Sequence, residues 1–281
     1  MVRRLTPPLR LFAPFAFALL ASLTACSSRG GGRSAGKVAA PAPPAASAVR
    51  AAASAPAASA SAAPVEAKRQ DPEPAPEAPA TVDALEVTGD VRASIVRGRG
   101  GSAPRTVFVP GLCSNAYAYL LGFPEAARQQ GGVVAIDGDV PCVPGFRSFS
   151  WDAARLDARI RAALAAAGQS AFPEEGVTLV GYSQGAALAE QLVQRWPARY
   201  TRLVLIGAPT DPSPSHFRTA KGVVTMSCSL DVPWRMKEAA RGIARAGVPS
   251  RYVEMPGCTH GNIGKGDETL GAAFDFLRGD S

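Results

Sequence analysis

The stretch that decides the fold of this 281-residue chain is Val177-Thr178-Leu179-Val180-Gly181-Tyr182-Ser183-Gln184-Gly185. It begins with a largely apolar run, which is typical of a strand buried in a parallel sheet. Residues 184–196 follow it, and their alanines and leucines predict a helix. The turn between strand and helix contains the pattern G-x-S-x-G. Its glycines allow a tight turn that exposes a serine hydroxyl, so we take Ser183 as the candidate nucleophile.

Strands and helices are predicted to alternate on both sides of this stretch. Short connections and repeated alternation indicate a mostly parallel sheet with helices on both faces, an α/β sandwich. About 14 residues separate the strand that ends at Gly207 from the next strand, which leaves little or no room for a lid. We expect a hairpin over 84–96, strands at 106–109, 133–137, 177–181, 202–207, 223–226 and 251–255, and helices at 117–130, 151–167, 184–196, 234–246 and 267–277.

A serine hydroxyl needs a base to become a nucleophile, and the sequence contains two histidines. Residues that follow the carboxyl ends of parallel strands converge on one edge of the sheet. His260 comes directly after the last predicted strand, so it is the favoured base. His216 lies in a loop further from its strand and is the alternative.

An acid must orient the imidazole and stabilise its charged form. Asp231 follows the strand that ends near Ser227 and gives the chain order Ser, Asp, His. Asp211, after the preceding strand, is the alternative. Asp137 and Asp139 also follow a strand, but they precede the nucleophile and would break this order.

Two backbone N–H groups are needed to hold the negative oxygen that develops during acyl transfer. The residue after the nucleophile, Gln184, supplies one of them. The second should come from the loop after the strand at 106–109, where Leu112 is the best candidate and Cys113 the next.

With these motifs, the segment from about Thr106 to Leu277 resembles the α/β-hydrolase superfamily, within its esterase and dienelactone-hydrolase-like range. The resemblance implies a serine hydrolase that cleaves carboxylic esters through an acyl-enzyme, with no cofactor and no metal. The short lid region favours small or modest-sized esters. Two alternatives remain open: a non-catalytic binding lipoprotein on the same fold, and an acyltransferase that uses the same triad.

Residues 1–25 have the basic start and short apolar core of a signal peptide. Leu23-Thr24-Ala25-Cys26 resembles the lipobox of bacterial lipoproteins, which implies acylation of Cys26 and a membrane anchor. Ser27 after that cysteine favours the outer membrane. Residues 26–81 are rich in Ala, Pro and Ser and are expected to form a disordered tether, with the catalytic domain at 82–281.

The charge of the chain belongs mainly to this leader. Residues 1–80 hold nine of the 30 Lys and Arg but only four of the 23 Asp and Glu, so the rest of the chain is close to neutral. A nucleic-acid-binding surface needs a basic stripe on the folded part, and none is expected. No apolar run after the leader approaches the roughly 20 residues of a membrane-spanning helix. We expect a monomeric domain.

Four cysteines remain after Cys26, and each follows a predicted strand. An exported domain favours disulfides over free thiols. Structural zinc is disfavoured because the spacings lack C-x-x-C pairs. Four cysteines allow three pairings, of which Cys113–Cys142 and Cys228–Cys258 are favoured.

Overall fold

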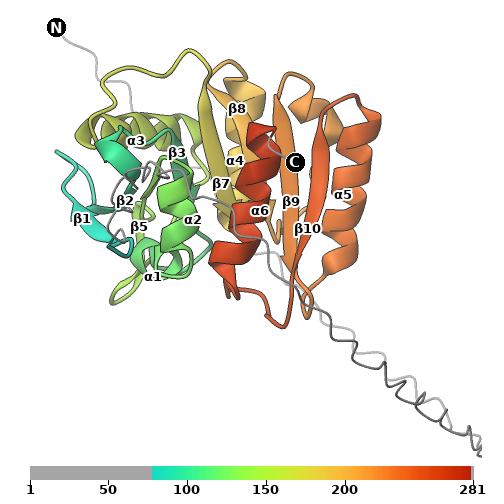
Figure 1. Cartoon of the computed structure of the whole chain (residues 1–281), viewed down its shortest axis with the longest axis horizontal. Helices are drawn as coiled ribbons and strands as arrows, with labels where there is room; N and C mark the ends of the chain where they lie inside the picture. Colours follow the sequence, from blue (N-terminus) through green and yellow to red (C-terminus); the bar gives the residue numbers. More distant parts are fainter. Residues whose placement is uncertain (1–77, 280–281) are drawn as a thin grey trace, which may run out of the picture. The chain divides into compact units, whose positions relative to one another are not determined.

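A computed structural model of the protein describes residues 78–279 (Figure 1). The expected signal peptide, Cys26 and the tether up to residue 77 lie outside the described residues. The last part of the expected tether already contacts the domain. Arg128 donates a 2.7 Å hydrogen bond to the carbonyl of Ala78, and Ala80 packs against the core.

The centre of the domain is an eight-stranded sheet in the order β1-β2-β4-β3-β7-β8-β9-β10. The six strands from β4 to β10 in this order are parallel, whereas β2 runs antiparallel to both β4 and β1. The sheet is therefore mostly parallel, as the sequence predicts. Its strands are β1 (Asp83–Leu85), β2 (Ala93–Arg97), β3 (Thr106–Val109), β4 (Gly132–Ala135), β7 (Val177–Tyr182), β8 (Tyr200–Ile206), β9 (Gly222–Cys228) and β10 (Ser250–Met255).

Helices cover both faces of this sheet (Figure 1). One apolar layer packs the sheet against α3, α4 and α5, and the other packs it against α1, α2 and α6. Because helices bury both faces of the sheet, its strands carry apolar side chains on both faces. The helices are α1 (Ala116–Leu120), α2 (Pro124–Gln129), α3 (Ala153–Ala166), α4 (Gln184–Arg195), α5 (Pro233–Arg245) and α6 (Gly266–Arg278).

The strand order reverses direction at β3. The chain passes from β3 to β4 on one side and later returns to β7 on the other side of β3. Loops that leave the carboxyl ends of such neighbouring strands diverge and open a crevice, which is where ligands bind in open α/β sheets. This places the loop after Val109 beside the turn after Tyr182.

The prediction of a single helix over 117–130 is wrong. The structure has two short helices, α1 and α2, separated by residues 121–123. Pro124 disfavours helical geometry at Phe123, which has φ −150° and ψ 45°. Gly122 packs against the loop that precedes α6, because a Cβ on Gly122 would lie 2.0 Å from Cγ2 of Ile263.

A second, two-stranded sheet was not expected from the sequence. It is a hairpin of β5 (Val140–Val143) and β6 (Phe146–Ser148), which follows β4. Cys142 therefore lies within a strand rather than beyond one. The hairpin is joined to the loop after β3 by two backbone hydrogen bonds of 2.9 Å between Ser114 and Arg147.

The connection from β8 to β9 contains only the short 3-10 helix η2 (Pro214–Phe217). The expectation of a minimal lid at this position is confirmed. Within residues 78–279, none of the helices has the length and apolar character that crossing a membrane requires.

Gly185 lies where α4 begins directly under the end of β3, and no side chain fits there. A Cβ on Gly185 would lie 1.9 Å from the carbonyl oxygen of Val109 and 2.6 Å from that of Pro110. Because both neighbours are backbone atoms, Gly185→Ala should destabilise the protein by about 3 kcal/mol in urea unfolding. Gly271→Ala is the matched control. Gly271 lies in α6 with nothing within 4 Å of an added Cβ, so this change should stabilise by about 0.5–1 kcal/mol. Equal effects of the two changes would contradict the close packing at Gly185.

Candidate active site

Ser183 sits at a strained turn between β7 and α4. Its φ of 52° and ψ of −114° lie outside the regions that non-glycine residues ordinarily occupy. Cys113, with φ 49°, is the one other non-glycine residue at positive φ between residues 78 and 279. A Cβ on Gly181 would lie 2.4 Å from the carbonyl oxygen of Gly185, so the motif needs its glycines for close packing. Backbone strain at two positions beside one crevice is typical of a functional site.

The structure brings the three predicted side chains into one hydrogen-bonded chain. Nε2 of His260 lies 3.0 Å from Oγ of Ser183, and Nδ1 of His260 lies 2.7 Å from Oδ2 of Asp231. The Asp231 side chain is 18% exposed, whereas the His260 side chain is 45% exposed. The imidazole can therefore take a proton from the serine, the carboxylate can hold its tautomer, and water can reach the ring.

The alternative residues are engaged elsewhere. Nδ1 of His216 lies 2.8 Å from a carboxylate oxygen of Glu190, on α4. Asp211 forms an ion pair with Arg235, at 2.9 Å. The two aspartates after β4 support local backbone: Asp137 accepts from the N–H of Ala116, and Asp139 accepts from Ser150.

The loop after β3 passes close to the serine. A Cβ on Gly111 would lie 3.2 Å from Cβ of Ser183, so the backbone of this loop adjoins the reacting hydroxyl. In the described part of the chain, the N–H groups of Leu112 and Gln184 have no acceptor. The N–H of Cys113, by contrast, donates to Oγ of Ser148 at 2.9 Å. The N–H groups of Leu112 and Gln184 are thus available as donors, whereas that of Cys113 is not.

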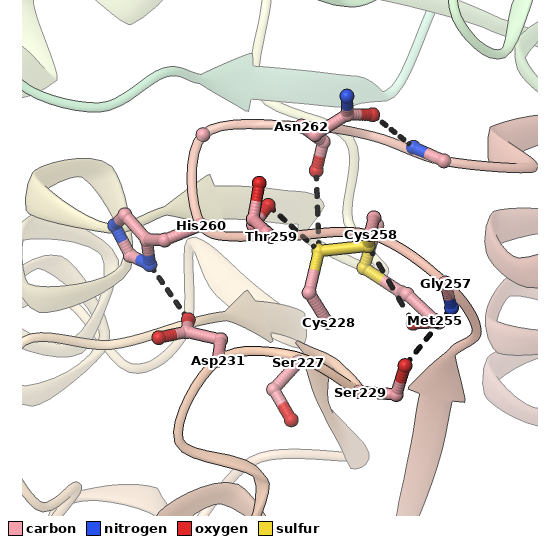
Figure 2. The surroundings of a disulfide bond; sticks show 12 residues. Ser227, Cys228, Ser229, Asp231, Met255, Gly257, Cys258, Thr259, His260 and Asn262 are labelled. Atoms are coloured by element: carbon pink, nitrogen blue, oxygen red, sulfur yellow. Dashed lines mark hydrogen bonds and ion pairs between the residues drawn. A yellow bond between two sulfur atoms is a disulfide. The ribbon is translucent and has the colours of Figure 1, made fainter.

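The loops that carry Asp231 and His260 are cross-linked to each other (Figure 2). Cys228, the last residue of β9, forms a disulfide with Cys258, two residues before His260. The N–H of Leu230 donates to the carbonyl of Cys258 at 3.1 Å, and Ser229 accepts from the N–H of Gly257 at 2.9 Å. The acid and the base are therefore held at a fixed separation.

A second disulfide, Cys113–Cys142, joins the loop after β3 to the β5–β6 hairpin. Both bonds are the pairings expected from the sequence. The side chain of Gln184 adds a further link, because its amide makes hydrogen bonds of 3.1 and 2.8 Å with the backbone of Phe149. The strained backbone at Cys113 is thus braced by the hairpin.

Two tyrosines that sequence reasoning missed hold the histidine loop. The hydroxyl of Tyr182 accepts from the N–H of Gly261 at 2.8 Å and donates to the carbonyl of Asn262 at 3.1 Å. Burial raises the pKa of Tyr182 to about 12, so the hydroxyl remains a donor at ordinary pH. Its ring lies edge-on to His260, with centroids 5.5 Å apart. The hydroxyl of Tyr119 donates to the carbonyl of Gly261 at 3.1 Å. The G-x-S-x-G motif allows any residue before Ser183, so the sequence does not indicate that Tyr182 holds the histidine loop.

The sheet order, the turn at Ser183 and the arrangement around it define the α/β-hydrolase fold. The solved structures that it resembles include a fluorophosphonate-binding serine hydrolase of Staphylococcus aureus, with a TM-score of 0.52 and 10% identity, covering 71% of this chain and 99% of that one. A protein of Thermoplasma acidophilum described as a predicted CIB-like hydrolase has a TM-score of 0.53 and 19% identity, covering 71% and 98%. An esterase of the fungus Rhizomucor miehei has a TM-score of 0.50 and 16% identity, covering 73% and 84%. No protein-family model matches the sequence, and no curated protein matches it significantly.

Proposed function

We propose that this protein is a serine hydrolase that cleaves carboxylic esters through an acyl-enzyme. The observation that carries the proposal is the hydrogen-bonded chain from Ser183 through His260 to Asp231, placed on a strained turn. The resemblance to hydrolases and esterases of the same fold supports it. A positioned base, an orienting acid and two free N–H donors are the parts that acyl transfer needs.

In the first half of the reaction, Oγ of Ser183 attacks the ester carbonyl carbon while Nε2 of His260 takes the hydroxyl proton. The N–H groups of Leu112 and Gln184 stabilise the negative oxygen of the tetrahedral intermediate. When the carbon–oxygen bond to the alcohol breaks, the imidazolium gives its proton to the departing oxygen. Asp231 remains ionised and stabilises the imidazolium.

In the second half, water attacks the acyl-enzyme and loses a proton to His260. The bond between the acyl carbon and Oγ then breaks, and the serine regains its proton from the imidazolium. Because the side chain of His260 is exposed to solvent, water can reach the ring that takes its proton. An alcohol that took the place of water would give acyl transfer, and product analysis with an added alcohol distinguishes the two reactions.

The proposal is tested by labelling the full chain with a fluorophosphonate, in which Oγ bonds to phosphorus and fluoride departs. We expect labelling of the natural chain and of His216→Ala, whose ring pairs with Glu190. Labelling should be lost in Ser183→Ala and in His260→Ala. A folded natural chain that takes no label would overturn the hydrolase and favour the binding lipoprotein.

We further propose that the enzyme is exported and anchored to the outer membrane through acylated Cys26. The lipobox-like sequence before Cys26 and the two disulfides of the domain support this, since such bonds persist in oxidising compartments. The same labelling experiment tests the anchor if cells are fractionated first. The labelled band should lie with membranes for the natural chain and should leave them in Cys26→Ala. A labelled band that is soluble in both would refute the anchor alone.

A further inference from the structure

Two cavities of very different size flank the side chains of the candidate site. The smaller has a volume of about 80 Å³ and is lined by Ser183 and His260 themselves, by the loop after β8 and by the start of α5. The larger, of about 420 Å³, lies between the loop after β3, α1, the tip of the β5–β6 hairpin and residues 261–263. An ester has two substituents around its carbonyl, an acyl chain and an alcohol. Unequal cavities therefore predict unequal substituents.

Several walls of the smaller cavity are held in place by hydrogen bonds or by burial. Arg235 donates to the carbonyls of Ala208 and Pro209, at 3.3 and 3.2 Å, and so fixes the loop that forms one wall. Met236 is 1% exposed and forms another wall. Gly207 already packs against the imidazole, because a Cβ there would lie 3.1 Å from Cε1 of His260. The volume of the smaller cavity, about 80 Å³, is roughly a fifth of the 420 Å³ of the larger cavity, so it suits a much smaller substituent.

The larger cavity is in the size range of small-molecule sites. Among the described residues, no charged side chain lines it. Its polar groups are mostly engaged within the protein: Tyr119 donates to Gly261, and the amide of Asn115 bonds to the backbone of Gly145 and Ala118. Leu112, Phe146 and Ile263 contribute apolar surface. A charged group would find no counter-charge in this lining, so the cavity favours an uncharged occupant.

The reaction decides which substituent each cavity takes. The acyl group stays bonded to Oγ of Ser183 after the alcohol has left, and Ser183 lines the smaller cavity but not the larger one. The departing alcohol, whose oxygen takes a proton from Nε2 of His260, then belongs in the larger cavity, which Gly261 and Asn262 of the same loop line. The acyl chain then points to the other side, towards Val232 and Met236. We propose that the site selects esters of a short acyl group, acetyl or propionyl, with a larger uncharged alcohol. This inference rests on the proposed function.

The test is a series of 4-nitrophenyl esters from acetate to octanoate, hydrolysed by the full chain. We expect kcat/KM to be highest for acetate or propionate and to fall about tenfold for each methylene beyond the cavity. Val232→Ala and Met236→Ala should each move the optimum to longer chains. Val232 is 39% exposed, so its variant remains informative if loss of the buried methionine unfolds the protein. Phe146→Ala, on the opposite side, should leave the optimum unchanged.

A second series fixes the acyl group as acetyl and varies the alcohol. Phenyl and naphthyl acetates should be better substrates than acetylcholine or the acetate of an anionic hydroxy acid, and Phe146→Ala should weaken this preference. An optimum at butanoate or longer, or an optimum that Phe146→Ala moves, would overturn the assignment and leave the hydrolase standing. If no ester is hydrolysed and Ser183 takes no fluorophosphonate, the proposed function and this inference both fail.

Discussion

Hydrolysis of a good ester by Ser183→Ala is expected to be slower than that of the natural chain by about four to six orders of magnitude in kcat. The alanine removes the atom that forms the acyl-enzyme, so the remaining rate comes from water attacking a bound ester. His260→Ala should lose about as much, because Oγ without a base at 3.0 Å stays protonated. Steady-state kinetics with an acetyl ester measures both variants.

The double variant provides the decisive control, because serine and histidine act as one unit. Ser183→Ala together with His260→Ala should be no slower than either single change, whereas independent contributions would multiply. His216→Ala should keep the natural kcat, since its ring pairs with Glu190. A double variant slower than each single variant by the product of their effects would contradict a shared mechanism.

Asp231→Asn is expected to lower kcat by about 10⁴-fold without unfolding the protein. The asparagine amide can donate to Nδ1 of His260, which would place the ring proton on Nε2, the atom that must accept from Ser183. The carboxylate prevents this tautomer by accepting from Nδ1 at 2.7 Å. The pH dependence of kcat and thermal unfolding of the variant, measured together, separate lost chemistry from lost structure.

Asp211→Asn is the matched control for this change. Asp211 is also a carboxylate beyond a strand of the sheet, but it pairs with Arg235 at the surface. Its loss should change kcat by less than about twofold, in keeping with an exposed ion pair. If Asp211→Asn were the more damaging change, the acid would have to be reassigned.

The region around Ser183 could be predicted from the sequence because its signals are local. A buried strand, a turn that needs glycine and a helix follow one another within 20 residues, and the parallel sheet then places later loops at the same edge. This rule also selected His260 over His216. The structure places His260, which follows β10 closely, beside Ser183, whereas His216 lies on η2, where it pairs with Glu190 of α4.

The parts that sequence reasoning missed depend on distant residues. The β5–β6 hairpin is short and contains Pro141, and it is held by Cys113 and Ser114, which lie 29 and 33 residues before their partners Cys142 and Arg147. The break between α1 and α2 falls at Pro124, a local signal that the prediction of one helix overlooked, and packing of Gly122 on Ile263 adds a distant contact there. Tyr182 occupies an unrestricted motif position, and its role depends on where the loop after β10 lies.

The stability of the folded chain and the assembly of its candidate site depend on the same two disulfides. They join residues 29 and 30 positions apart, and in the chain-entropy model each such ring destabilises the unfolded chain by about 3.5 kcal/mol. One ring begins at Cys113, which anchors the loop that carries Leu112. The other ring contains Asp231. A copy that fails to form either bond loses stability and site geometry together. Because proteases remove preferentially the copies that unfold, the surviving population is enriched in molecules whose site is assembled.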